Sequence, residues 1–187
     1  MRGYKNHSVL IDALALPEFR DDLAALHLVF TGGSEIHSRD ALLARAARAG
    51  LAERVRIHDC VSREDLALLY RHATATVVPS LYEQGSFPIY EALHYDCPVA
   101  CSDIPSLREQ CAGLGDAMIY FDPHDVRAVA AAIRTLVRDR SAIRRAQAAR
   151  AAAAPGRSWA DAAEEWLAVF RSAARSFTPP APARAAA

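Results

Sequence analysis

Short apolar runs alternate with longer segments of helical period along most of this 187-residue chain. The first run, HLVFTGG, has the pattern of a buried strand that ends in a glycine turn. Strands that alternate with helices form a parallel sheet with helices on both faces. The chain is therefore predicted to be an α/β protein with a Rossmann-like, doubly wound parallel sheet, whose strands lie at residues 27–33, 54–60, 74–80, 97–103 and 117–122.

The segments between these runs carry the signals of helix ends. Gly50 is expected to close a helix over 38–50, Ser62 to cap the start of a helix, and Pro123 to precede the first turn of another. The predicted helices that follow the strands cover 62–73, 89–95, 105–111 and 123–139, with more helix to about residue 150.

The chain begins with a helical segment, and no strand precedes it. Residues 4–16 place an apolar face on this helix, formed by Leu10, Ile11, Leu14 and Leu16. In a doubly wound sheet the strand before the first helix is usually central. We therefore expect the first strand to be missing here and its two neighbours to keep unpaired backbone groups along one edge each.

The carboxyl-terminal part differs in pattern from the rest. A break at Pro155-Gly156 is followed by an amphipathic segment with Trp159, Trp166 and Phe170, and then by a proline- and alanine-rich end. The sequence thus predicts a Rossmann-like domain over 1–154, a closing amphipathic helix over 155–176 and a disordered tail over 177–187.

Charge and composition exclude several classes of protein. The 22 basic and 22 acidic residues give zero formal net charge, which argues against a nucleic-acid partner. No run of about 18 apolar residues is present, and the amino terminus does not resemble a signal peptide. The four cysteines lack metal-site spacing and are typical of reduced thiols in a cytoplasmic protein.

Two glutamates flank a break after the third predicted strand, in the stretch PSLYEQGSFPIYEALHYDC. Pro88 is tolerated only in the first turn of a helix, so Ser86 is the expected N-cap. The N–H groups of Gly85, Ser86 and Phe87 are then expected to be free at the helix start, where an anion binds well. This edge of a doubly wound sheet, at the carboxyl ends of the strands, is where ligands bind.

The carboxylates of Glu83 and Glu91 would repel a phosphate, so they are expected to face another part of the ligand. Paired acceptors suit sugar hydroxyls, and a molecule with phosphates between two sugars is a nucleotide sugar. Spacing alone favours the simpler alternative, a capped helix with a solvated Glu91 and with Glu83 at a strand end.

The same stretch resembles the glutamate–seven–glutamate signature of the group 1 glycosyltransferases, which are retaining enzymes of GT-B fold. RGYKNHSVLIDAL, LVFTGG, LAERVRIHDCVSREDLALLYRHATATVVPS, GLGDAMIYFDPHDVRAVAAAI and RSWADAAEEWLAVF are similar to further family segments, in the family's order. The resemblance covers residues 2–172. It implies the carboxyl-terminal, donor-binding half of a GT-B fold.

The resemblance implies a role for each site residue. Glu91 would accept hydrogen bonds from ribose hydroxyls, and Glu83 would hold hydroxyls of the transferred sugar. The diphosphate would be held by the N–H groups of Gly85, Ser86 and Phe87 and neutralised by Lys5 and Arg2, while the base would pack near His58 and Cys60. No metal or other cofactor is expected, since no Asp-x-Asp motif is present and Lys5 would supply the positive charge.

The implied function is transfer of a sugar from a nucleotide diphosphate sugar to a saccharide or lipid acceptor. The family's amino-terminal acceptor domain is not in this sequence, so we expect a fragment that is inactive alone, from a cytoplasmic enzyme that could associate peripherally with the inner face of the membrane. A nucleotide-sugar-binding module without activity and a GT-B epimerase or phosphorylase remain alternatives. A dinucleotide oxidoreductase is disfavoured, because no G-x-G-x-x-G follows a strand.

Two positions depart from the family pattern. Gln84-Gly85-Ser86 stands where the family usually has Gly-Phe-Gly, and Asp96 stands where glycine is common. Aspartate tolerates a left-handed backbone better than most residues do, so Asp96 could keep the turn that glycine makes.

Overall fold

The computed structural model describes residues 3–33, 36–153 and 158–176. The chain divides into two units, Met1–Ala153 and Ala154–Ala187. The second unit contains the helix α9 (Trp159–Ser176), in which the rings of Trp166 and Phe170 lie 5.7 Å apart. The predicted break at Pro155-Gly156 and the predicted tail over 177–187 lie outside the described residues. No helix in the described ranges has the length and apolar character needed to cross a bilayer.

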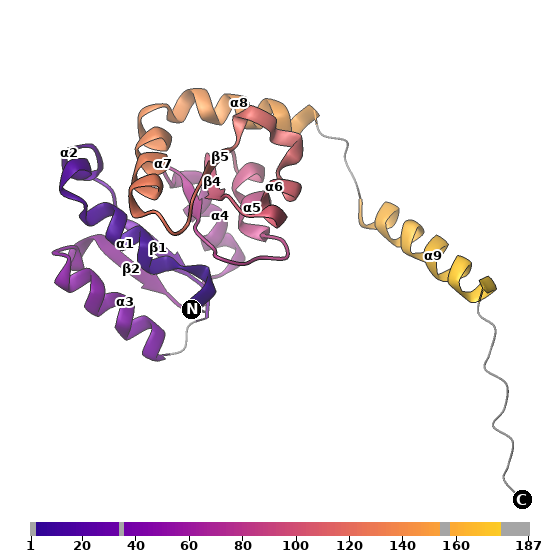
Figure 1. Cartoon of the computed structure of the whole chain (residues 1–187), viewed down its shortest axis with the longest axis horizontal. Coiled ribbons are helices and arrows are strands. Elements are labelled where there is room, and N and C mark those ends of the chain that lie inside the picture. Colours follow the sequence, from indigo (N-terminus) through magenta and orange to yellow (C-terminus); the bar gives the residue numbers. More distant parts are fainter. Residues whose placement is uncertain (1–2, 34–35, 154–157, 177–187) are drawn as a thin grey trace, which may run out of the picture. The chain divides into compact units, whose positions relative to one another are not determined.

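The first unit alternates strands and helices (Figure 1). Its strands are β1 (Leu28–Thr31), β2 (Val55–His58), β3 (Thr76–Val78), β4 (Val99–Ser102) and β5 (Ile119–Phe121). Its α-helices are α1 (His7–Ala15), α2 (Arg20–Leu23), α3 (Ile36–Arg48), α4 (Arg63–His72), α5 (Phe87–His94), α6 (Pro105–Gln110), α7 (Val126–Arg138) and α8 (Arg140–Ala153). Its 3₁₀ helices are η1 (Gly3–Lys5), η2 (Pro17–Phe19), η3 (Ala52–Arg54) and η4 (Ala112–Ala117). The five predicted strands are all present, each shorter than its apolar run.

Every strand pair in the described residues is parallel, which confirms the predicted α/β class. The strands form two sheets, β1-β2 and β3-β4-β5, in place of one. The division falls between β1 and β3, which would be the two neighbours of a central first strand. The edges of these two strands are left unpaired in the part of the chain that the structure describes, as the sequence predicted.

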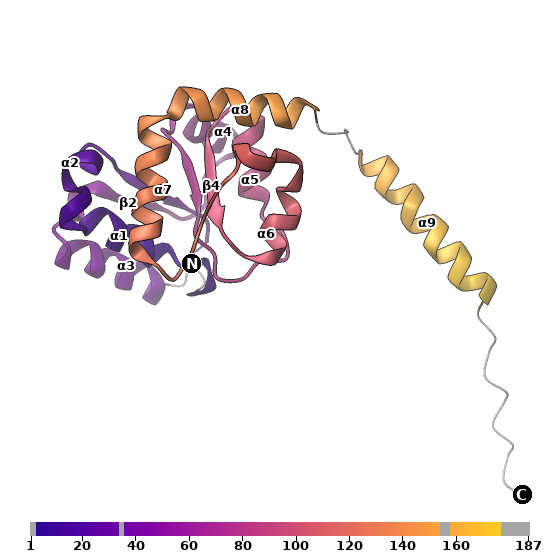
Figure 2. The same ribbon diagram turned by 45° about the horizontal axis from the view of Figure 1, so that its top comes forward.

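Two hydrophobic clusters lie on opposite faces of β4. Because side chains alternate along a strand, Ala100 joins one cluster while Val99 and Cys101 join the other, and all four residues of β4 are buried. The first cluster lies under α1, α3 and α7 and also takes side chains from β1 and β2, so it connects the two sheets. Figure 2 shows α1 and α7 side by side. The second cluster lies under α5 and α6.

A buried glutamine of α8 completes the hydrogen bonding of this core. The Gln147 side chain is 1% exposed, and its Oε1 accepts from the N–H of Val99 at 2.9 Å. Its Nε2 donates to the carbonyl oxygens of Val99, at 2.8 Å, and Ala117, at 3.1 Å. Gln147 therefore satisfies three backbone groups at the start of β4 and the end of η4.

The half-buried His7 imidazole makes the stability of the fold depend on pH. It lies edge-on to the Phe30 ring at 5.0 Å. Burial, with nearby positive charges that include Lys5, lowers the pKa of His7 from 6.5 to about 4. The unfolded chain then binds the proton more readily than the folded chain between these pH values.

We expect the free energy of unfolding to fall by up to about 3 kcal/mol as the pH is lowered from about 6.5 to 4. Urea titrations at several pH values across this range give the free energy of unfolding as a function of pH. The slope of this pH dependence should be shallower for His7→Phe than for the parent chain. The exposed His72, changed to Gln, is the control and should leave the slope unchanged. Parallel slopes for His7→Phe and the parent would contradict the assignment of this pH dependence to His7.

Candidate functional site

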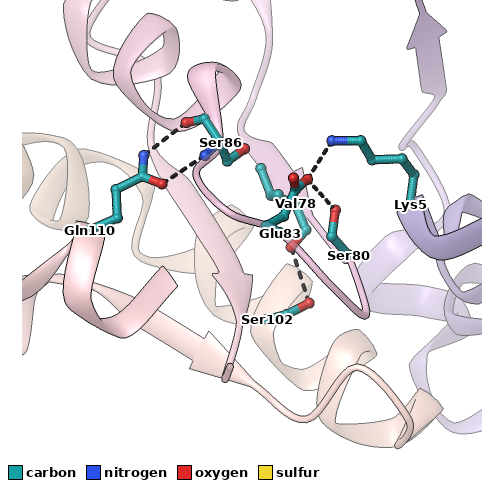
Figure 3. A network of polar contacts seen from close by, with 7 residues as sticks. All are labelled: Lys5, Val78, Ser80, Glu83, Ser86, Ser102 and Gln110. Atoms are coloured by element: carbon teal, nitrogen blue, oxygen red, sulfur yellow. Dashed lines mark hydrogen bonds and ion pairs between the residues drawn. The ribbon is translucent and has the colours of Figure 1, made fainter. Parts of the chain in front are cut away.

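The loop between β3 and α5, residues 79–86, carries Glu83 at the carboxyl end of β3. The Glu83 side chain is 9% exposed, and its Oε1 accepts from the Ser80 hydroxyl at 2.8 Å. The Lys5 ammonium forms an ion pair with the same oxygen, as Figure 3 shows. A Ser102 hydroxyl bond to the Val78 carbonyl, at 3.3 Å, ties the base of this loop to β4. The carboxylate of Glu83 is thus fixed from two sides.

Lys5 reaches this loop because the start of the chain is anchored to it. The N–H of Leu81 donates to the carbonyl of Tyr4 at 2.8 Å. Asn6 has a left-handed backbone, with φ at 53°, and its side chain donates to the Pro123 carbonyl at 2.9 Å. The structure therefore brings together two predicted site residues, Lys5 and Glu83, that lie 78 positions apart in the sequence.

The start of α5 differs from the prediction at one group. Pro88 lies in the first turn and Ser86 is the N-cap residue, as expected, but the Ser86 side chain caps no backbone N–H. The N–H of Ser86 donates to Gln110 Oε1 at 2.7 Å, and Gln110 Nε2 donates to the Ser86 carbonyl at 2.8 Å (Figure 3). The expectation of a free N–H at Ser86 is therefore wrong, because a side chain from α6 already occupies it. Gly85 and Phe87 are exposed.

Ser86 carries one further unusual feature. Its hydroxyl oxygen is buried and has no hydrogen-bond partner among the described residues. A buried polar atom without a partner costs stability. The loop that holds Glu83 is thus closed at its far end by Gln110, while the serine hydroxyl at the start of α5 is unused.

Glu91 lies one turn into α5 and is half-buried. Its Oε2 accepts a hydrogen bond from the Tyr70 hydroxyl at 2.8 Å. Burial, and then this bond to Glu91, raise the pKa of Tyr70 well above its usual range. The simpler alternative, in which Glu91 is a solvated surface residue, therefore does not describe this carboxylate. Sequence reasoning did not find Tyr70 or Gln110, because neither residue belongs to a recognisable local pattern.

Two further residues of the predicted site come from the end of β2 and the loop after it. His58 ends β2 and Cys60 follows it, and both are exposed at the carboxyl end of that strand. Between them in sequence, Asp59 accepts from Arg39 Nη1 at 2.9 Å. Arg2 lies outside the described residues. The loop before α5 holds the cation of Lys5 against the carboxylate of Glu83, and α5 itself has an exposed start and carries the carboxylate of Glu91. This combination suits a ligand with both phosphate and hydroxyl groups.

Comparison with known proteins identifies the family of this chain. Residues 1–154 match the family described as "Glycosyl transferases group 1". The chain belongs to this family. A group 1 glycosyl transferase relative, D-inositol 3-phosphate glycosyltransferase of Nocardia farcinica, is 32% identical over 176 residues, which cover 92% of this chain and 39% of the relative.

Solved structures of related fold extend the comparison. Sucrose-phosphate synthase from Thermosynechococcus elongatus matches with a TM-score of 0.76 at 22% identity, over 94% of this chain and 44% of that one. Anabaena HepE in complex with UDP matches with a TM-score of 0.69 at 21% identity, over 92% of this chain and 46% of that one. The fold of this chain is thus a Rossmann-like domain similar to those of GT-B glycosyltransferases. The chain spans less than half the length of each of these proteins.

Proposed function

We propose that this chain is the donor-binding part of a retaining group 1 glycosyl transferase, which holds a nucleoside diphosphate sugar at the carboxyl ends of β3 and β4. The observation that carries this proposal is the ion pair between Lys5 and the buried Glu83 beside the exposed start of α5. A cation and a carboxylate placed side by side can receive the two unlike ends of a sugar–phosphate bond.

In this proposal the donor replaces the contact between the two side chains. The Lys5 ammonium turns to the diphosphate and stabilises the negative charge that grows as the bond to the sugar breaks. The Glu83 carboxylate, still held by Ser80, accepts hydrogen bonds from sugar hydroxyls. A carboxylate that is only 9% exposed, as Glu83 is, binds hydroxyl donors strongly when it loses its cation.

The other residues complete the donor site. The N–H groups of Gly85 and Phe87 face the diphosphate at the start of α5, where the helix dipole favours an anion. Glu91 accepts from the ribose hydroxyls, and Tyr70 orients its carboxylate through the 2.8 Å hydrogen bond. We assign Ser86 a structural role, because Gln110 occupies its backbone groups. Arg2 would be a second cation for the diphosphate.

The base of the nucleotide is proposed to lie against the exposed end of β2, at His58 and Cys60. The saccharide or lipid acceptor would be held by residues outside this chain, since the chain covers only 39% of its glycosyltransferase relative. Transfer needs donor and acceptor in attacking geometry, a contribution of about 7–11 kcal/mol to the barrier. We therefore propose that the 187 residues bind the donor but do not transfer its sugar without an acceptor-binding partner.

Replacing each glutamate separately tests this division of roles. Glu91→Ala should weaken binding of both UDP and a UDP-sugar by roughly tenfold to a hundredfold, the effect of losing a hydrogen bond to a charged group. Glu83→Ala should weaken binding of the UDP-sugar by a similar factor, and it should weaken binding of UDP much less. Titration calorimetry with UDP, GDP and ADP and their sugars provides the measurement.

The exposed Glu53, changed to Ala, is the matched control and should alter neither affinity. Equal and small effects of Glu83→Ala and Glu91→Ala on every ligand would return both residues to a structural role. Failure of all three nucleotides to bind the folded parent chain would remove the proposal itself.

A further inference from the structure

A polar hollow lies at the amino ends of the strands, whereas the proposed donor site lies at their carboxyl ends. Its volume is about 380 Å³, and it is lined by Arg71, His94, Tyr95, Asp96, Arg140 and Arg144. These residues come from the end of α4, from the turn between α5 and β4, and from the start of α8. They surround the amino ends of β3 and β4, whereas Glu83 follows the carboxyl end of β3. Figure 2 shows α8 running across this end of the unit, close to α4.

The hollow carries three guanidinium groups against a single carboxylate. Arg144 Nη2 lies 3.9 Å from Asp96 Oδ2, and about half of each side chain is exposed, so this ion pair is loose. Arg140 donates from Nε to the Thr74 carbonyl at 2.9 Å and from Nη2 to the Ala73 carbonyl at 3.1 Å. These bonds fix its head group but use only two of its five N–H donors.

Aromatic contacts hold the third guanidinium and the floor of the hollow. The Arg71 head group lies over the Tyr95 ring at 5.2 Å, and Tyr95 stacks on Tyr70 at 5.8 Å. His94 contacts the edge of Tyr95 at 4.8 Å. Asp96 has the left-handed φ of 55° that its position in the turn requires, so it keeps the turn where the family has glycine. Arg71 and Arg140 are therefore held in place before any ligand arrives, while the loosely paired Arg144 can turn toward one.

A contribution to the stability of the fold explains only part of the positive charge around this hollow. Arg71 and His94 lie in the last turns of α4 and α5, where the helix dipole favours a cation. Arg140 and Arg144 lie in the first two turns of α8, where the same dipole disfavours one. Three guanidinium groups gathered in one hollow against a single carboxylate indicate an anionic ligand.

We propose that this hollow is a second ligand site, which binds a phosphate monoester. Planar guanidinium groups form paired hydrogen bonds to phosphate oxygens, and three of them suit a dianion. The volume lies in the range of small-molecule sites and leaves room for more than the phosphate itself. Because the lining is polar, the part of the ligand that carries the phosphate should be hydrophilic. A sugar phosphate fits this description, and so does the phosphate head group of an anionic lipid. This site does not depend on the proposed donor site.

The test uses inorganic phosphate and ribose 5-phosphate as probes, titrated into the full chain with UDP present to fill the donor site. Arg71→Gln combined with Arg144→Gln should weaken binding of ribose 5-phosphate at least tenfold and leave the affinity for UDP unchanged. The control combines Arg20→Gln with Arg48→Gln, which removes the same charge from exposed positions of α2 and α3. Sedimentation with phosphatidylcholine vesicles, with and without phosphatidic acid, distinguishes the lipid source from the soluble one.

Binding that is equally weakened by both pairs of substitutions would overturn the proposal, since it would reflect net charge alone. Absence of binding by the parent chain at physiological ionic strength, to soluble probes and vesicles alike, would also overturn it. Thermal unfolding monitors the fold of each variant. Arg144→Gln alone, which removes only the loose ion pair to Asp96, should still weaken binding in a chain of unchanged stability.

Discussion

Replacing Gln147 with alanine is expected to lower the free energy of unfolding by about 3–5 kcal/mol. The substitution removes three hydrogen bonds. It leaves the buried N–H and carbonyl of Val99, and the partly buried carbonyl of Ala117, without that partner. It also opens a cavity at a side chain that is 1% exposed. Urea-induced unfolding of the parent and variant chains measures the difference.

The matched control is Gln110→Ala. Gln110 makes the same paired contact to one residue's backbone, at Ser86, but on a partly exposed surface where water can replace it. Its loss should cost about 1 kcal/mol, a typical net value for a hydrogen bond. Similar losses for the two variants would contradict the importance of burial at Gln147.

Replacing Lys5 with alanine is expected to weaken binding of nucleoside diphosphates by roughly tenfold to a hundredfold. The variant loses the ammonium that the diphosphate would contact, and the buried Glu83 loses its cation. Glu83→Gln removes the carboxylate that pairs with Lys5, and it should not weaken binding of a nucleoside diphosphate that carries no sugar. The neutral amide no longer competes for Lys5, so the affinity for UDP should stay the same or rise.

A loss of affinity with Lys5→Ala and no loss with Glu83→Gln would exclude a general disturbance of the loop. Calorimetric titration with UDP, GDP and ADP measures both, and unfolding curves show whether each variant is folded. If Lys5→Ala and Glu83→Gln weakened nucleotide binding equally, the ion pair would be a structural feature and Lys5 would have no direct role in binding.

The periodicity of the sequence predicted the strands of this fold well. Each strand is a short apolar run between turn residues, and a run such as TATVVPS is constrained locally by burial and by its flanking breaks. The division of the sheet also agrees with the expectation from the sequence, because the doubly wound order places the strand that was expected to be missing between β1 and β3.

The contacts within the site were less predictable. Glu83, Glu91 and Lys5 were recognised as site residues, but the Lys5–Glu83 pair joins positions 78 apart, and Tyr70 reaches Glu91 from 21 positions away. Gln110 and Gln147 bond to backbone groups 24 and 48 positions distant. A glutamine has no local signature for such a bond, so the occupied N–H of Ser86 could only come from the three-dimensional structure.

The most direct test of the account is a titration of UDP, GDP and ADP into the isotopically labelled chain, followed by amide chemical shifts. The account predicts binding tighter than millimolar for at least one nucleotide, with the largest shifts at Gly85, Phe87 and Glu91 and at the end of β2. Binding no tighter than millimolar for all three, or shifts confined to residues away from the start of α5 and from Lys5, would contradict the donor-site assignment.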